Sequence, residues 1–536
     1  MKFMYPTRIV AQENTENTET LLKEKRLQIG LKEQDLFIMK GKSYVILDFG
    51  KEVVGGVRIL TYKAEESGRV RLRFGESVSE TCAELGEKNA TNDHALRDFC
   101  TELKFYSDIK FGQSGFRFLR VDTLEDCANV QIKSVVVASE VDERPAIGSF
   151  ECNDMLVNQI WDTAAYTIRL CMQNGYFWDG IKRDRLVWIG DLYPEMRAAH
   201  CVFGEVPETE NSLDFAQEEN PLPGWMNRLP AYSLWWLMIL HDEYQISSNK
   251  PKFAKYLPYV KELLKQISDC VAVDGEMIYP DNFIDWPTRV LFGKTREEQN
   301  DVLAGMAYLT KIAVEKTVAF LQAFAEDTTL CKDILSRVNR KPRKVETFKQ
   351  IAGLGVWAGD CSENNKRLLL NGGAKGMSTF LSYPILSGVA ALGEYETALS
   401  MMKEYYGGML SVGATSFWED FDLDWLENCN RIDELPKVGK VDIHGDKGAF
   451  CYTGFRHSFC HGWSAGVLPY LMETVVGIRL EEIGQKRIKI QPNLSGLKHV
   501  KATYPTAWGV LKVEHILKDN GEIETKVDVP QGIEIV

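Results

Sequence analysis

The feature that most constrains the fold of this chain is a change in the spacing of its apolar residues, which occurs twice. Residues 40–145 contain short runs in which apolar and charged residues alternate, as in Arg69–Phe74, and this period of two is typical of half-exposed strands. Between residues 152 and 477 the apolar residues recur with helical spacing instead. Residues 480–536 return to strand patterns. The sequence therefore predicts a multidomain α+β protein with a helical domain between two β-domains.

The helical part has aromatic, Gly- and Asp-rich loops between its helices, and loops of this kind carry function in many proteins. Helices are expected at 154–164, 232–247, 251–271, 302–326, 377–392 and 394–406, and loops at 174–191, 220–230, 275–290, 353–376 and 409–429. An α-solenoid would show a sequence repeat, and we find none. We predict an N-terminal β-sandwich (1–147), a central (α/α)6 toroid or barrel (148–478) and a small C-terminal β-sandwich (479–536).

The composition excludes several classes of partner. A net charge of −13 opposes binding to nucleic acid or to an anionic membrane and suits a neutral ligand. The 12 Trp, 20 Tyr and 25 Phe are typical of a carbohydrate-binding protein or of a large aromatic core. The first residues lack a secretory signal, and the twelve cysteines show no zinc-ligand spacing. We expect a cytoplasmic protein with reduced thiols, no metal or cofactor, and a homodimer as one oligomeric form.

Residues 176–191 are the most informative stretch, because Asp179, Asp184 and Asp191 lie there among two arginines, a lysine and two tryptophans. Carboxylates can bind sugar hydroxyls and transfer protons, and indole rings can pack on the C–H face of a pyranose. The alternative is a buried ion-pair network at a helix start, in which Arg183 and Arg185 neutralise the acids. The residues alone leave both interpretations open.

A second acidic segment, Gly413–Phe421, contains Glu419 between Trp418 and Asp420. A carboxylate on a loop that begins with glycine is a plausible catalytic base. The alternative is a helix capping box, because Ser416 and Glu419 have the spacing of an N-cap residue and its N3 partner. This choice also stays open at the level of the residues.

Both segments resemble signatures of the bacterial α-L-rhamnosidases, glycoside hydrolase family 78. Asp179, Arg183, Arg185 and the run Trp188–Asp191 match the family's first acid, its two arginines and its Trp-x-Gly-Asp end. Where the family carries a glutamate as general acid, this chain has the shorter Asp184. The segment ending in Glu419 is similar to the family's Gly-Ala-Thr-Thr-x-Trp-Glu, whose glutamate is the general base.

The resemblance implies an inverting glycoside hydrolase that removes terminal rhamnose, with Asp184 as acid and Glu419 as base. Substrate contacts are implied for Asp179, Arg183, Trp188, Asp191, Asp285, Trp286 and His461. Asp285 could equally be a turn residue and Trp286 a core residue, and His461 could be structural. Trp225 and Trp357 are further candidate platforms, and Glu195 is a second candidate acid. A glycosidase for another sugar, or a carbohydrate-binding protein that has lost catalysis, are the alternatives.

Overall fold

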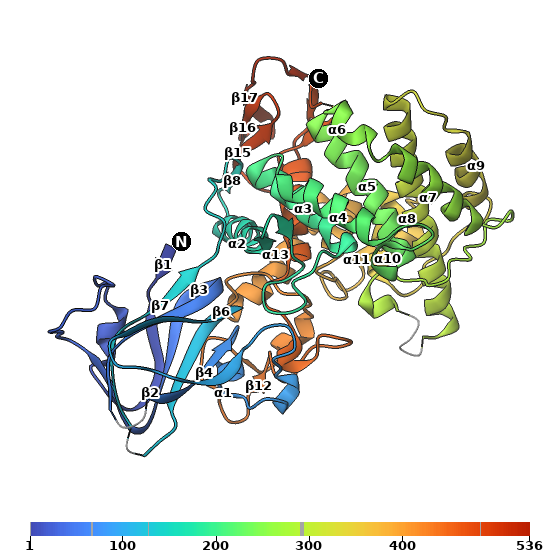
Figure 1. The fold of residues 1–536 in the computed structure, drawn as a ribbon. Coiled ribbons are helices and arrows are strands. Elements are labelled where there is room, and N and C mark those ends of the chain that lie inside the picture. Colours follow the sequence, from blue (N-terminus) through green and yellow to red (C-terminus); the bar gives the residue numbers. More distant parts are fainter. Residues whose placement is uncertain (1, 66–67, 127, 290–293, 483) are drawn as a thin grey trace.

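The computed structural model describes residues 2–65, 68–126, 128–289, 294–482 and 484–536. It has three parts, which Figure 1 shows as an N-terminal β-domain in blue, a helical domain in green to orange and a small C-terminal β-region in red. The predicted order of β-domain, helical domain and β-domain is therefore confirmed. Among the described residues, no helix is long and apolar enough to cross a membrane.

The N-terminal domain is built on a seven-stranded sheet within the described residues, in the order β1-β7-β3-β6-β4-β5 with β2 on β3. Its strands are β1 (Lys2–Met4), β2 (Arg8–Glu16), β3 (Phe37–Glu65), β4 (Arg69–Gly75), β5 (Asp98–Glu102), β6 (Ser107–Thr123) and β7 (Asn129–Ser139). The start of β3 and its end both pair with β7. The sheet therefore closes on itself around a core that includes Phe37, Val45 and Phe116.

Strand β3 is longer than the sequence pattern predicts. The pattern indicates two short strands separated by the glycines around residue 50, whereas the structure has one continuous strand. Its register against β6 shifts between Asp48 and Val53 and again between Gly55 and Val57. These irregularities absorb the glycines as bulges, because glycine tolerates the backbone geometry that a bulge requires.

The contacts between the helices of the helical domain follow a cyclic order. Helix α2 contacts α3, and successive contacts run through α5, α8, α10, α12 and α13 back to α2. The (α/α)6 toroid itself stays a prediction. The described helices are α2 (Met155–Cys171), α3 (Ile189–Phe203), α4 (Pro207–Glu219), α5 (Pro230–Ser247), α6 (Lys250–Ala254), α7 (Leu257–Asp269), α8 (Arg296–Ala323), α9 (Thr329–Val338), α10 (Lys349–Trp357), α11 (Glu363–Leu370), α12 (Ser382–Ala391), α13 (Tyr395–Ser411) and α14 (Val467–Tyr470).

The prediction of a loop over residues 353–376 is wrong, because this segment contains most of α10 and all of α11. Gly353 and Gly355 give the segment a loop-like composition. Yet a Cβ at Gly353 would stand 3.1 Å from the backbone of Ile385. Here glycine lets α10 pack closely on α12, so tertiary packing overrides the low helix propensity of glycine.

The C-terminal region contains β13 (Ile478–Leu480), β14 (Arg487–Ile490), β15 (His499–Thr506), β16 (Gly509–Leu517), β17 (Ile523–Asp528) and β18 (Glu534–Ile535). A four-stranded sheet has the order β17-β16-β15-β8, in which β8 is Ser149–Cys152. The strand that precedes the helical domain therefore pairs with the C-terminal sheet. This pairing connects the start of the helical domain to its end.

Candidate active site

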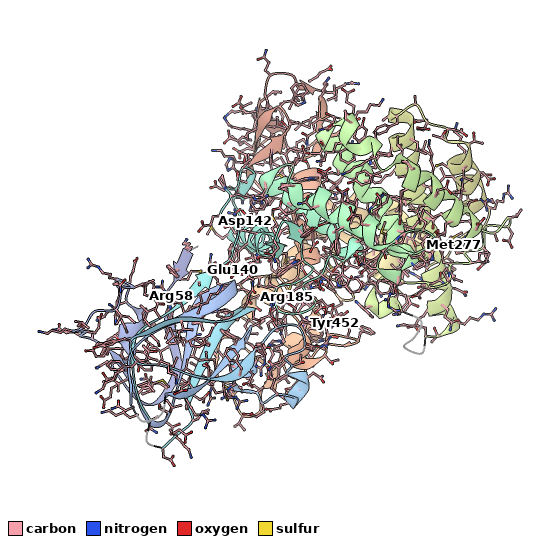
Figure 2. All side chains as sticks on the ribbon, in the orientation of Figure 1. Arg58, Glu140, Asp142, Arg185, Met277 and Tyr452 are labelled. Atoms are coloured by element: carbon pink, nitrogen blue, oxygen red, sulfur yellow. The ribbon has the colours of Figure 1, made fainter. Side chains whose placement is uncertain are left out.

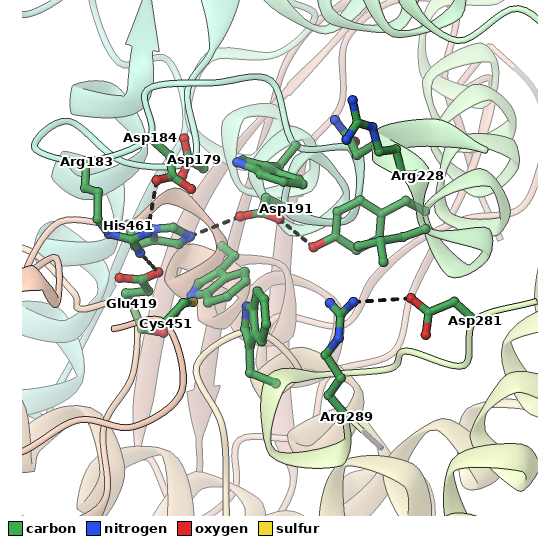
Figure 3. Close-up of a pocket in the computed structure, with 16 residues that line it drawn as sticks. Asp179, Arg183, Asp184, Asp191, Arg228, Asp281, Arg289, Glu419, Cys451 and His461 are labelled. Carbon is green, nitrogen blue, oxygen red and sulfur yellow. Dashed lines mark hydrogen bonds and ion pairs between the residues drawn. The ribbon is translucent and has the colours of Figure 1, made fainter. Parts of the chain in front are cut away.

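A cavity of about 250 Å³ opens at the loops of the helical domain and contains most of the predicted site residues (Figure 3). It is lined by Asp179, Arg183, Asp184, Trp188, Asp191, Asn227, Arg228, Leu229, Tyr232, Asp281, Trp286, Arg289, Glu419, Cys451, His461 and Trp463. The structure thus brings the two acidic segments together, although Arg183 and Glu419 are 236 positions apart.

Glu419 is buried on one side of this cavity and is held in its ionised form. Arg183 Nη2 donates to its Oε1, and the backbone N–H of Ser458 donates to its Oε2 at 3.2 Å. Burial raises the pKa of Glu419, but the charge of Arg183 and, next, His461 outweigh burial and lower it to about 2. The carboxylate is therefore able to accept a proton at neutral pH.

The capping-box interpretation of Glu419 is wrong, because no helix begins at this segment in the described part of the chain. The Ser416 hydroxyl instead donates to the carbonyl of Phe459 at 2.8 Å. Trp463 Nε1 donates to the Glu419 carbonyl at 2.9 Å. These contacts fix an irregular loop against the segment that leads to His461.

Asp184 and Glu419 contact the same guanidinium group, that of Arg183. Arg183 Nη1 donates to Asp184 Oδ1 at 3.0 Å while its Nη2 contacts Glu419. Asp184 and Arg185 both adopt left-handed backbone conformations, with φ of 55° and 59°. The loop turns sharply at this point, and the turn leaves the Asp184 side chain partly exposed toward the cavity.

Two more carboxylates form the floor of the cavity. Asp191 accepts from Tyr232 at 3.2 Å and lies 3.0 Å from His461 Nε2. Burial raises the pKa of Asp191, and the contact with His461 opposes this rise. Burial and, next, the charges of Asp184 and Asp191 raise the pKa of Asp179 well above its ordinary value. The site thus holds carboxyl groups in different environments, as acid–base chemistry and hydroxyl binding require.

Aromatic rings wall the cavity. Trp188 meets Tyr232 edge to face, with ring centroids 6.1 Å apart. Trp463 packs on His461, with centroids 4.3 Å apart, and Trp286 also lines the space. Flat apolar walls combined with carboxylates suit a small polyhydroxylated ring.

Asp285 differs from the other predicted site residues, because it is not among the residues that line this cavity. It is the N-cap of the short helix η4 (Trp286–Thr288), and its Oδ1 accepts from the backbone N–H of Trp286 at 2.7 Å. Burial raises the pKa of Asp285 to about 6. The structure therefore gives Asp285 the turn role that the sequence left open, and a direct sugar contact stays a prediction.

The three weaker candidates also lie outside this cavity. Glu195 is buried in α3, and a Cβ at Gly462 would overlap its carboxylate. Trp225 packs against Tyr279. Trp357 lines a separate cavity. Sequence reasoning in turn did not name Asn227, Arg228, Tyr232, Asp281, Arg289, Cys451 and Trp463. Asn227, Arg228, Asp281 and Arg289 nevertheless lie in the predicted loops 220–230 and 275–290.

Side chains of the N-terminal domain contact the segment that carries Arg183 and Asp184. Lys182 Nζ lies 2.9 Å from Glu76 Oε2 and 3.4 Å from Glu80 Oε1, and both glutamates belong to the N-terminal domain. Glu76, Glu80 and His444 are the one group among the described residues with a spacing that could hold a metal ion. The ammonium group of Lys182 contacts all three of these side chains, so Lys182 supplies the positive charge beside the two glutamates.

Glu76 also contacts the segment that holds the base. Its Oε2 accepts from the backbone N–H of Phe459 at 2.7 Å, and the preceding residue, Ser458, donates to Glu419. Figure 2 shows Arg185 and Tyr452 at the junction of the two domains. Both halves of the site are therefore anchored on the N-terminal β-domain.

Comparison with known proteins gives the same domain order as the fold. The bacterial alpha-L-rhamnosidase concanavalin-like domain matches residues 38–138, the 6 hairpin glycosidase domain of these proteins residues 145–329, and their C-terminal domain residues 477–536. A comparison with curated proteins finds no match.

Solved structures show the same fold at low sequence identity. A GH78 family rhamnosidase of Bacillus sp. GL1 aligns with a TM-score of 0.74 and 18% identity over 96% of this chain and 55% of that chain. A rhamnosidase from Klebsiella oxytoca with rhamnose bound aligns with a TM-score of 0.66 and 18% identity, over 88% of this chain and 95% of that chain. The Streptomyces avermitilis alpha-L-rhamnosidase complexed with L-rhamnose aligns with a TM-score of 0.69 and 14% identity, over 100% of this chain and 49% of that chain.

This chain thus spans little more than half the length of the Bacillus protein. Its three parts nevertheless match three domains of bacterial alpha-L-rhamnosidases. The chain therefore belongs to the family of the bacterial α-L-rhamnosidases.

Proposed function

We propose that this protein is an inverting glycoside hydrolase of the α-L-rhamnosidase type, which removes terminal rhamnose from glycosides or oligosaccharides. One observation carries the proposal: a single guanidinium group, that of Arg183, contacts both Asp184 and Glu419 at the edge of an aromatic-walled cavity. Two carboxyl groups that face one sugar from separate parts of the chain are what glycoside hydrolysis uses. Rhamnose bound to the Klebsiella and Streptomyces relatives supports the choice of sugar.

In the proposed reaction, Glu419 takes a proton from a water molecule, and the oxygen of that water attacks the anomeric carbon. Asp184 gives its proton to the glycosidic oxygen, so the aglycone leaves as an alcohol. An inverting pair stands roughly 6.5–9.5 Å apart, which leaves room for the water. Asp179, Asp191 and His461 bind sugar hydroxyls in this proposal, and Trp188 and Trp286 enclose the ring.

The charge of Glu419 fits the role of the base. Glu419 is ionised at neutral pH, as a base must be, because its pKa lies at about 2. The alternative of a sugar-binding protein without catalysis is motivated by Asp184, which is shorter than the family's glutamate. A glycosidase for another sugar is the second alternative. Turnover on a panel of aryl glycosides separates these functions, because a binding protein would hold the sugar and release no phenol.

The roles of the two carboxyl groups are tested with a pair of rhamnosides, one with an acidic phenol and one with an alkyl leaving group. Asp184→Asn should slow hydrolysis of the alkyl rhamnoside by a factor on the order of 10²–10⁴, and that of the aryl rhamnoside much less. Glu419→Gln should slow both substrates equally, because both need an activated water. Asp528→Asn, on an exposed strand, is the matched control. Equal losses on both substrates in Asp184→Asn would exclude Asp184 as the acid.

Cytoplasmic location is also a proposal, and the described cysteines, which are all free thiols, support it. A homodimer stays a prediction, and measurement of the mass in solution tests it.

A further inference from the structure

A histidine of the N-terminal β-domain reaches the active site. His94 lies in the loop between η2 (Glu87–Asn89) and β5, and its Nδ1 is 3.0 Å from Asp184 Oδ1. The same Nδ1 is 2.6 Å from the backbone N–H of Asp184, which donates to it. The His94 side chain is 31% exposed, so it connects the Asp184 carboxyl group with solvent.

The protonation state of His94 Nδ1 decides which of these two contacts is a hydrogen bond. When Nδ1 carries a lone pair, it accepts from the Asp184 backbone N–H or from a protonated Asp184 carboxyl group. When Nδ1 carries a proton, it donates to the carboxylate instead. The two short distances therefore describe a pair of groups between which one proton can move.

We infer that His94 and Asp184 hold the catalytic proton together, with His94 as a positioning residue that acts through Asp184. This inference rests on the proposed function. In each turnover, the one proton of the pair passes from Asp184 to the glycosidic oxygen, and Asp184 becomes a carboxylate. His94 then takes up one proton from solvent, which restores the proton of the pair. Glu419 releases to solvent the proton it took from water, so the enzyme returns to its starting state.

Charged side chains face both members of the pair. Arg183 contacts the same Oδ1 atom of Asp184 at 3.0 Å. Asp93 Oδ2 lies 3.8 Å from His94 Nε2 and also pairs with Arg456. An imidazole ring can accept or donate a proton, so a second proton-carrying group lies within hydrogen-bond distance of the acid.

A purely structural role would need only a hydrogen-bond acceptor for the Asp184 backbone. Asparagine can supply that acceptor, but it cannot carry a proton. His94→Asn is therefore the test variant. His499→Asn is the matched control, because His499 also pairs with a carboxylate, Glu514, at 3.0 Å, on a sheet of the C-terminal region.

The experiment measures kcat/KM from pH 5 to 9 on an alkyl rhamnoside and on an aryl rhamnoside with an acidic phenol. We expect His94→Asn to move the alkaline limb of the alkyl profile to lower pH by on the order of one unit, and to leave the aryl profile in place. The control should match the wild-type protein on both substrates. Added imidazole should restore the alkaline limb in His94→Ala, which supplies a second variant if the first fails to fold.

An unchanged alkaline limb in both His94 variants, with a uniform loss of rate at every pH, would overturn the inference and leave His94 a structural role. A wild-type protein that hydrolyses neither rhamnoside would overturn the proposed function instead, and the inference with it. The two failures are thus distinguished by the wild-type protein alone.

Discussion

Replacing Arg183 by glutamine should make the activity of this protein sensitive to acid. Arg183 is buried, and its guanidinium group contacts Glu419 on one side and Asp184 on the other. It is the largest of the influences that lower the pKa of Glu419, and burial acts in the opposite direction. Glutamine removes the charge and keeps a polar side chain, which ends short of the positions of the Arg183 Nη atoms.

The magnitude follows from the pKa of the base. The interval from the ordinary value of 4.5 to about 2 corresponds to about 3 kcal/mol in favour of the carboxylate, at 1.36 kcal/mol per pH unit. Without Arg183 the effect of burial remains and only the charges of His461 and His457 still oppose it, so the pKa of Glu419 should rise. In the wild-type protein, Glu419 stays ionised down to about pH 2. In the variant, kcat/KM should fall as pH drops through the new pKa, because the protonated carboxyl group cannot activate water.

The assay is kcat/KM on an aryl rhamnoside with an acidic phenol between pH 4 and 8, since this substrate needs little help from the general acid. Arg185→Gln is the control, because Arg185 stacks on Trp178 at 4.9 Å and lies outside the cavity lining. The variant's fold is first checked by thermal unfolding, since breaking a buried ion pair can cost about 3–5 kcal/mol. If the Arg183 variant keeps a flat profile from pH 4 to 7, the argument that Arg183 keeps Glu419 ionised is refuted.

Two more predictions concern buried acids. Burial is the first cause that raises the pKa of Glu76, to about 7, so unfolding releases its proton between pH 4.5 and about 7, and the free energy of unfolding should fall as pH rises through this window. Glu76→Gln should flatten that fall in denaturant titrations at several pH values, and an unchanged slope would contradict it. Asp191→Asn should lower kcat/KM by roughly 10–100-fold, because it weakens the contacts to His461 and Tyr232. This factor is what the loss of one hydrogen bond to a charged group typically costs. A loss of kcat/KM under twofold would count against a role for Asp191 in sugar binding.

The parts of the site that sequence reasoning could predict are the ones that lie in short motifs. Asp179, Asp184 and Asp191 are close in sequence, so their type and spacing are visible together. Yet the residues alone left a sugar site and a buried ion-pair network as equal interpretations. The contact between Arg183 and Glu419 shows that an ion pair and a cavity exist at the same place. That contact joins positions far apart in the chain, and no local pattern encodes it.

The residues that were missed belong to other elements. His94 lies on an N-terminal loop and Tyr232 on α5, and neither stands in a motif of charged or aromatic residues that marks a site. The order of the domains, by contrast, follows from apolar periodicity, because that pattern reports the face that each element buries. Glycine misled the prediction where it serves close packing of helices, as at Gly353.

The same property of glycine gives a last prediction, for Gly190 of the Trp-x-Gly-Asp run. A Cβ at Gly190 would overlap the ring of Tyr232, whose hydroxyl donates to Asp191. Gly190→Ala should therefore destabilise the protein by about 1–3 kcal/mol and also lower kcat/KM, because the displaced ring cannot hold Asp191. Gly388→Ala is the control, since the nearest atoms to its Cβ stand at 3.5 Å and alanine favours a helix by about 0.5–1 kcal/mol. If Gly190→Ala unfolds like the wild-type protein in denaturant, then glycine at this position is not required by the approach of Tyr232.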